Sequence, residues 1–365
     1  MSKSYTGLQD VIATDTSISL LDTSSKKIVI RGHDLIDLSQ EKEYLDVVHL
    51  LLEGKFFSNE EGKALDKELR THGSIPKEIM EIISLLPKQT HPMDAQRTGI
   101  SVLANYDERL DDRTKEVNKQ RAYQLIAKVP TITVNSYRVL NNELIIEPRE
   151  DLSYSANFLY MITGKVPSKM EEEIFDKSLL LYSEHELPNS TFTARVIAST
   201  NSDLYGALTG AVASLKGNLH GGANEAVMYM LNEAGSVAAF EQLMYAKLKN
   251  KEKIMGFGHR VYMKQMDPRA TRMKESLKTL SEQDGDDTLL RMCEAGEKVM
   301  LEEKGLYPNL DYYAAPVYWK LNIPISLYTP IFLSARTAGI CAHVMEQHAN
   351  NRIYRPRVNY TGEAY

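Results

Sequence analysis

Helical hydrophobic periodicity runs through almost the whole chain from Ser39 onward. Within residues 45–52, for example, residues of one face recur three and four positions apart, and Gly54 follows as a helix-ending residue. Residues 58–61 and 168–171 both read Ser-x-x-Glu, the capping box that opens a helix. A chain with so many helix signals is constrained to a mainly α fold.

Strand signals are confined to residues 8–38. There, aliphatic and β-branched residues over 18–22 and 27–31 flank a short polar turn, which predicts a small N-terminal β-hairpin. Two helix boundaries are also predicted from local rules. Pro130 separates two apolar helices, because proline interrupts the helical hydrogen bonds, and Asp94 caps the helix that follows it.

One histidine stands in a glycine-rich stretch between two apolar segments. Residues 217–225 place His220 among three glycines and two asparagines, after the apolar segment 204–215 and before 226–231. Glycine is tolerated where the backbone turns sharply or where another group approaches closely. The stretch is therefore either a plain corner between two helices, whose histidine caps a helix, or a corner that presents His220 to a ligand.

Other ionisable residues also fall where the helical pattern breaks, rather than on exposed helix faces. Helix ends combine irregular backbone with oriented dipoles, so several such residues predict a shared cleft. The residues at breaks are His185, His220, His259, Arg269 and Asp311.

The overall composition limits the classes of partner. The 365 residues carry a net charge of −6, which does not favour nucleic acid or an anionic membrane. No apolar run reaches the roughly 20 residues of a membrane helix, and the N-terminus lacks a signal-peptide pattern. Two cysteines, Cys293 and Cys341, form no disulfide framework. A cytoplasmic protein is expected.

The residues of this cleft could serve several kinds of chemistry. His220, His259 and Asp311 are a formally possible metal site, although no spacing is typical of one. A nucleophile elbow and a phosphate or dinucleotide fingerprint are absent from the sequence. Proton transfer at carbon, with histidines as electrophiles and a carboxylate as base, remains as the hypothesis for an enzyme. A non-catalytic helical scaffold is the other class left open.

Three segments together resemble the citrate synthase family, in particular its short bacterial branch with the 2-methylcitrate synthases. They are residues 217–225 (GNLHGGANE), residues 256–269 with the motifs GFGHRVY and DPR, and residues 308–312 (PNLDY). The resemblance extends over nearly the whole chain. It implies an almost all-α homodimer, with a large domain of residues 1–221 and 323–365 and a small domain of residues 222–322 that closes over the substrates.

The resemblance also implies a role for each motif residue. Asp311 is expected to remove the α-proton of an acyl-CoA, neutral His220 to stabilise the enolate oxygen, and His259 to polarise the ketone of oxaloacetate. Closure would bring His220 to the two residues of the small domain and keep water from the enolate. The thioester is a substrate, so no further cofactor and no metal are expected.

The remaining site residues are assigned by the same resemblance. The guanidinium group of arginine binds a carboxylate through two parallel hydrogen bonds, which suits the dicarboxylate oxaloacetate. Arg355 matches an arginine that the family contributes across the dimer interface. The residues expected to hold oxaloacetate are His185, Arg269, Arg336 and Arg355, and those expected near the acyl-CoA are Phe332, Gly256, Gly258 and Lys264.

One spacing departs from the family pattern, and two segments bear on the choice of acyl-CoA. His259 and Arg269 are ten positions apart, one more than is usual in the family, which makes the path of the loop between them, and the reach of Lys264, open questions. Residues 183–191 and this loop look most like 2-methylcitrate synthases that also use acetyl-CoA. We therefore expect 2-methylcitrate synthase with citrate synthase activity, with a dedicated citrate synthase as the alternative.

Overall fold

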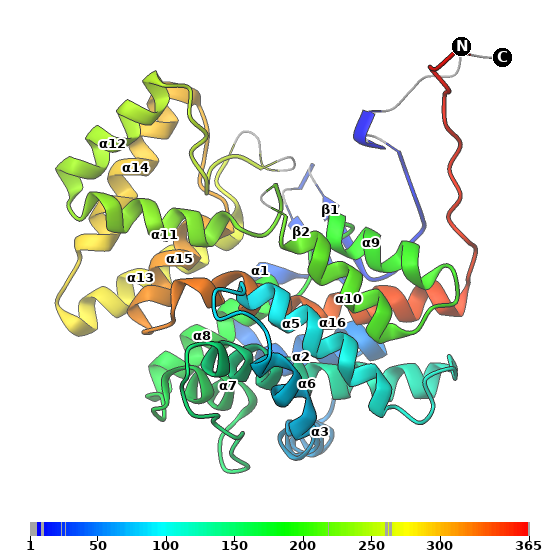
Figure 1. Cartoon of the computed structure of the whole chain (residues 1–365). Helices are drawn as coiled ribbons and strands as arrows, with labels where there is room; N and C mark the ends of the chain where they lie inside the picture. The colour runs from blue at the N-terminus through cyan, green and yellow to red at the C-terminus, as the bar shows by residue number, and fades with distance from the viewer. Residues whose placement is uncertain are drawn as a thin grey trace.

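The computed structural model describes residues 6–8, 11–22, 24–25, 27–217, 219–259, 262 and 265–363. Within them, the chain is mainly helical with a small antiparallel sheet, as predicted (Figure 1). The elements, in chain order, are η1 (Thr6–Leu8), β1 (Ser19–Asp22), β2 (Lys27–Ile30), β3 (His33–Asp34), α1 (Leu35–Glu41), α2 (Tyr44–Glu53), α3 (Asn59–Thr71), α4 (Lys77–Ser84), α5 (Pro92–Leu103), η2 (Ala104–Tyr106), α6 (Lys115–Leu140), α7 (Tyr154–Thr163), α8 (Lys169–Tyr182), α9 (Asn189–Ala198), α10 (Leu204–Leu215), α11 (Ala223–Ala234), α12 (Val237–Lys249), α13 (Pro268–Asp284), α14 (Thr288–Lys304), α15 (Leu310–Lys320), η3 (Ile325–Leu327) and α16 (Tyr328–Ala349).

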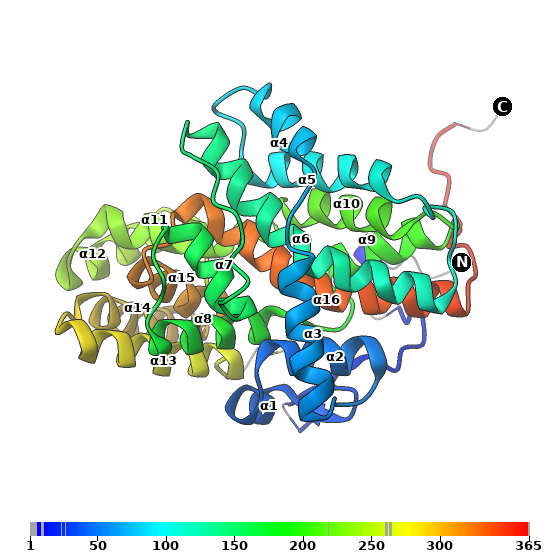
Figure 2. The same ribbon diagram turned by 90° about the horizontal axis from the view of Figure 1, so that it is seen from below.

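Two long helices form the centre of the larger group of helices. α16 is buried on all its faces over most of its length, since apolar and small residues surround its axis. α6 packs against it, and α2, α8, α9 and α10 also lie on α16 (Figures 1 and 2). Residues carried by α16 are therefore held by packing from several sides.

A second group consists of the five helices α11 to α15. They pack mainly on one another, in the pairs α13 with α15, α12 with α14 and α11 with α15. The group forms the left side of the view in Figure 1, from yellow-green to orange. It touches the first group through fewer contacts, among them those of α11 with α16 and of α13 with α8.

The N-terminal hairpin carries a third short strand that was not predicted. β1 pairs with β2 from Ser19 opposite Ile30, and β2 pairs with β3 from Val29 opposite Asp34. The predicted strand region also ends too late. Asp34 accepts a hydrogen bond from the backbone N–H of Ile36 at 2.9 Å, and this cap starts α1 inside it.

The predicted helix break at Pro130 is wrong. Pro130 lies inside α6, which continues to Leu140. The missing N–H of a proline leaves the carbonyl four residues earlier without its helical donor. That carbonyl is Ile126 O, and the hydroxyl of Tyr154 donates a hydrogen bond to it at 2.9 Å. A side chain of α7 therefore replaces the lost backbone donor.

The predicted cap at Asp94 is also wrong. α5 begins at Pro92, and the N-cap is His91, whose Nδ1 accepts the N–H of Met93 at 3.1 Å. Proline is favoured in the first helical turn because its φ is already helical. The proline therefore sets the start of the helix before Asp94 is reached.

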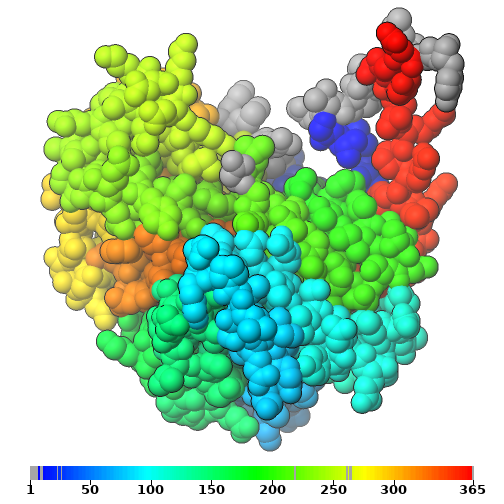
Figure 3. Space-filling model, in the orientation of Figure 1, coloured from blue at the N-terminus to red at the C-terminus, as the bar shows by residue number. Residues whose placement is uncertain are grey.

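Residues 350–363, after α16, have no regular structure. Figure 3 shows this tail, in red, standing away from the body of the molecule. In the described part of the chain, no helix combines the length and the apolar character required to cross a membrane.

Candidate active site

His220 stands at the corner between α10 and α11. The N–H of Gly221 donates to Leu215 O at 2.9 Å, and a Cβ at Gly221 would lie 2.6 Å from that oxygen, so the turn requires glycine. Nε2 of His220 accepts the backbone N–H of Ser190 at 3.3 Å. A neutral ring with an accepting Nε2 carries its proton on Nδ1. Burial and the charge of Arg336 lower the pKa of His220 to about 4, which keeps it neutral at pH 7.

The segments that carry His259 and Asp311 are bonded to each other. Asn309 donates its backbone N–H to Gly256 O at 2.9 Å and its side-chain amide to Gly258 O at 3.1 Å. The same asparagine caps α15 by accepting the N–H of Asp311 at 3.1 Å. One residue therefore links the glycine segment just before His259 to the helix start that carries Asp311.

Asp311 is a carboxylate whose environment favours a proton. The hydroxyl of Tyr182 donates to its Oδ1 at 2.7 Å. Burial raises the pKa of Asp311 to about 6, although Tyr182 and the charges of Arg269 and Arg336 lower it in part. A carboxylate with a pKa near the working pH is suited to act as a general base.

Two histidines and a tyrosine form a ring cluster. The rings of His185 and His259 are 5.0 Å apart, and Tyr262 stacks on His259 at 4.8 Å. Burial, with Arg269 next in effect, lowers the pKa of His259 to about 4 and that of His185 well below its usual range. Nε2 of His185 is buried and has no hydrogen-bond partner among the described residues, so it is available to a ligand.

Arg269 and Arg336, two of the residues expected to hold oxaloacetate, are buried. Arg269, in the first turn of α13, forms a two-point ion pair with Asp267, with Nη2 2.7 Å and Nε 3.1 Å from its oxygens. Arg336, on α16, donates from Nε to Tyr182 O at 2.6 Å, and its guanidinium lies 4.9 Å from the ring of Phe332. Burial lowers the pKa of Arg336 to about 10, so it stays charged at pH 7.

The three residues predicted to be catalytic lie in the electric field of these two arginines. Arg336 lowers the pKa of His220 and of Asp311, and Arg269 lowers the pKa of His259 and of Asp311. The corner that carries His220, the glycine segment before His259 and the start of α15 therefore all lie within reach of these two charges. Positive charges, neutral imidazoles and one carboxylate of raised pKa meet there, a combination suited to binding an anion and moving a proton.

Not every predicted residue is brought to this place. Arg355 lies on the exposed tail of the same chain, outside the cluster. Gly256 and Gly258 have φ values of 86° and 76° and serve the backbone pairing described above. Lys264 falls outside the described residues. Among the residues described, no three His, Cys, Asp or Glu side chains are placed to hold a metal ion.

Sequence reasoning missed several residues of the cluster. Tyr182, Tyr262, Asp267 and Asn309 all stand within or beside the predicted motifs but were given no role. Asp267 and Asn309 could have been found as N-caps, because each precedes a helix and accepts an N–H from it. Tyr182 gave no such signal, since a tyrosine in the last turn of an apolar helix is ordinary core.

Comparison with known proteins finds citrate synthases. A family model described as citrate synthase, C-terminal domain, matches residues 7–357. The citrate/2-methylcitrate synthase of Bacillus subtilis (strain 168) is 65% identical over 359 residues, covering 98% of this chain and 96% of that protein. The citrate synthase of Heyndrickxia coagulans is 67% identical over 356 residues, covering 98% and 95%.

Solved structures show the same fold. The ternary complex of carboxymethyl coenzyme A and oxaloacetate with citrate synthase from Thermoplasma acidophilum has a TM-score of 0.93 at 30% identity, covering 100% of this chain and 97% of that one. Citrate synthase from Pyrobaculum aerophilum has a TM-score of 0.90 at 35% identity, covering 98% and 92%. The sequence, the site geometry and these relatives lead to one conclusion: this chain belongs to the citrate synthase family.

Proposed function

We propose that this chain condenses an acyl-CoA with oxaloacetate and water, giving a tricarboxylate and free coenzyme A. The observation that carries the proposal is the meeting of a carboxylate of raised pKa, Asp311, with two neutral histidines in the field of two buried arginines. The names of the relatives support the same reaction.

The proposed steps follow from the protonation states. Asp311 takes the α-proton of the thioester, and Nδ1–H of His220 donates to the enolate oxygen that develops. The enolate carbon attacks the ketone of oxaloacetate, which His259 polarises and whose new alkoxide it protonates. Water then hydrolyses the thioester bond and releases the CoA thiol. Arg269, Arg336 and Nε2 of His185, an atom without a hydrogen-bond partner in the described part of the chain, hold the oxaloacetate oxygens.

For the acyl group, we propose propionyl-CoA with acetyl-CoA as a second substrate, so that the products are 2-methylcitrate and citrate. The relative from B. subtilis carries both names, whereas the one from H. coagulans is named citrate synthase. The alternative is a dedicated citrate synthase. One methylene changes discrimination by about 1–3 kcal/mol, which kinetics resolve easily.

The test is steady-state thiol release with the two acyl-CoAs side by side, with and without oxaloacetate. A higher kcat/KM for propionyl-CoA supports the proposed preference, and a strong preference for acetyl-CoA selects the alternative. No thiol release with either substrate would overturn the reaction itself. Activity that survives a chelator supports a reaction without metal, in line with the expected absence of a cofactor.

The hydroxyl of Tyr182 gives a prediction about pH. Its hydrogen bond stabilises the ionised form of Asp311, so Tyr182→Phe should raise the pKa of that base above about 6. The base must be ionised to act, and the acidic limb of kcat/KM should therefore move to higher pH. Tyr154→Phe, which loses a similar bond to Ile126 O, is the matched control. An unmoved limb in Tyr182→Phe would contradict the role given to Asp311.

We further propose that the protein is a cytoplasmic homodimer. In each subunit the small domain (residues 222–322) closes on the large domain (residues 1–221 and 323–365). Arg355 of each subunit enters the active site of the other. The exposed tail and the separate packing of α11 to α15 support these proposals.

Mixing two inactive variants tests the exchange of Arg355. If each site takes Arg355 from the partner, a mixture of Arg355→Leu and Asp311→Asn subunits forms heterodimers with one complete site. Random pairing then restores about a quarter of wild-type activity. If the arginine serves its own chain, mixing restores none. Activity is measured after unfolding and refolding the mixture.

A further inference from the structure

A buried charge next to the site has no role in the steps above. Glu184 lies on the loop between α8 and α9, directly before His185, and its side chain has no exposed surface. Burial alone would raise its pKa, but hydrogen bonds from His343 and Ser19, together with the charge of Arg336, hold the pKa of Glu184 below its ordinary value. A buried carboxylate that stays ionised calls for an explanation.

The loop is held on both sides of His185 by one serine. Ser19, in β1, donates its hydroxyl to Oε1 of Glu184 at 2.8 Å and accepts the N–H of Glu186 at 3.1 Å. Glu186 has a left-handed φ of 60°, which a non-glycine residue adopts only where its surroundings hold it. The position of His185 therefore depends on the bonds that its two neighbours make.

His343 fixes the other contact of Glu184, and its protonation can be deduced. Nη1 of Arg195 lies 3.0 Å from Nδ1 of His343. Arginine only donates, so Nδ1 accepts and the proton of the neutral ring is on Nε2. That N–H donates to Oε1 of Glu184 at 3.2 Å. The order of donors is thus Arg195 to His343 to Glu184.

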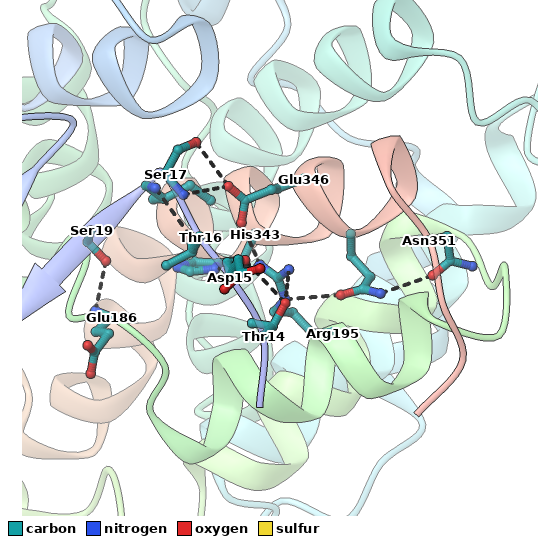
Figure 4. A network of polar contacts seen from close by, with 12 residues as sticks. Thr14, Asp15, Thr16, Ser17, Ser19, Glu186, Arg195, His343, Glu346 and Asn351 are labelled. Atoms are coloured by element: carbon teal, nitrogen blue, oxygen red, sulfur yellow. Dashed lines mark hydrogen bonds and ion pairs between the residues drawn. The ribbon is translucent and has the colours of Figure 1, made fainter. Parts of the chain in front are cut away.

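Arg195 is itself held from several directions, as Figure 4 shows in part. It pairs with Glu346 at 2.8 Å, and Glu346 accepts the backbone N–H of Ser17 at 2.8 Å. Nε of Arg195 donates to Gln347 at 3.1 Å. The amide of Gln347 donates at 3.0 Å to Asn351, which lies at the start of the C-terminal tail. The network thus joins the N-terminal segment, α9, α16 and the tail.

The second oxygen of Glu184 faces the helix of Arg336. Oε2 is buried and has no hydrogen-bond partner among the described residues. A Cβ at Gly339, one turn after Arg336 on α16, would lie 2.1 Å from it, so only glycine leaves room for this carboxylate. The negative charge sits close to α16 without an ion pair of its own to Arg336, and it stabilises the charged guanidinium through space.

We propose that Glu184 is a positioning residue for the oxaloacetate end of the site, held in place by His343 and Arg195. Its hydrogen bonds set the loop of His185, and its charge balances Arg336 in the low-dielectric interior. The proposal rests on the proposed function, since both residues that it positions are those assigned to oxaloacetate.

Glu184→Gln tests the charge while keeping the shape. The KM for oxaloacetate should rise on the order of tenfold, while the KM for the acyl-CoA stays within about twofold, because the loop and Arg336 belong to the oxaloacetate end. His343→Leu removes the donor to Glu184 and should change the same KM in the same direction. His343→Gln can still accept from Arg195 and donate to Glu184, and should restore the wild-type value.

The possible results distinguish a failure of the role proposed for Glu184 from a failure of the proposed function. A wild-type chain without thiol release would overturn the proposed function. With an active wild type, an unchanged oxaloacetate KM in both Glu184→Gln and His343→Leu overturns the inference alone. So does an equal rise in both KM values, or a lower melting temperature with unchanged kinetics, because those describe a merely structural role. If Glu184→Gln does not fold, the variants His343→Leu and His343→Gln test the inference, by the same comparison of the KM for oxaloacetate with the KM for the acyl-CoA.

Discussion

Replacing Asp311 by asparagine is expected to lower kcat by about 10²–10⁴-fold, the range that a positioned general base contributes. Asparagine fills the same volume and can still accept the hydrogen bond of Tyr182, but it cannot take a proton. Both KM values should change little. The measurement is thiol release at saturating oxaloacetate and acyl-CoA, and turnover within about tenfold of wild type would remove Asp311 from the role of base.

The same variant carries its own folding control. The pKa of Asp311 is raised from 3.8 to about 6 in the folded protein, so the folded state binds this proton more tightly than the unfolded state. The free energy of unfolding therefore falls as the pH rises through this interval, and above it the ionised carboxylate destabilises the fold. Asparagine removes that effect. At neutral pH the inactive variant should melt at the same temperature as wild type or higher.

Replacing His220 by alanine is expected to lower kcat by about 10²–10³-fold, the loss measured for removing one donor to a developing oxyanion. The reason is the proton on Nδ1, which the bond from Ser190 N–H to Nε2 leaves free to donate. The KM for oxaloacetate should stay near the wild-type value, since other residues hold that substrate.

Ser190→Ala is the matched control for this prediction. It removes the hydroxyl that lies 2.9 Å from Nε2 but keeps the backbone N–H that sets the tautomer. Its kcat should stay within about tenfold of wild type. If Ser190→Ala were as inactive as His220→Ala, the hydroxyl rather than the Nδ1 proton would be the group that matters.

Much of the fold was predictable because helix signals are local. Periodicity, capping boxes and glycines act within a few residues, so the boxes at Ser58 and Ser168 start helices as predicted. Pro130 was misread because its effect depends on a distant residue. The hydroxyl of Tyr154 satisfies the carbonyl that the proline frees, and nothing near Pro130 in the sequence indicates this.

Residues of the candidate site were likewise predictable where a local pattern marks them, and unpredictable where a contact joins distant parts of the chain. His220, His259 and Asp311 could be proposed from the sequence because each interrupts a helical pattern, and in the structure the charges of Arg269 and Arg336 act on them. His343 stands on a buried helix without a motif, so nothing near it in the sequence indicates a role. Its contact with Glu184 joins residues 159 positions apart, which no local pattern could predict.

The contact at Gly339 also limits how this chain can vary. Shortening residue 184 would clear one obstacle to a side chain there, but Ser183 O would still lie 2.6 Å from the new Cβ. Backbone cannot be trimmed by a compensating substitution, so no pair of changes at 184 and 339 opens the position. In a saturation library, residue 339 should stay glycine even on backgrounds that alter the carboxylate. Neutral drift at this helix would first have to move the loop itself.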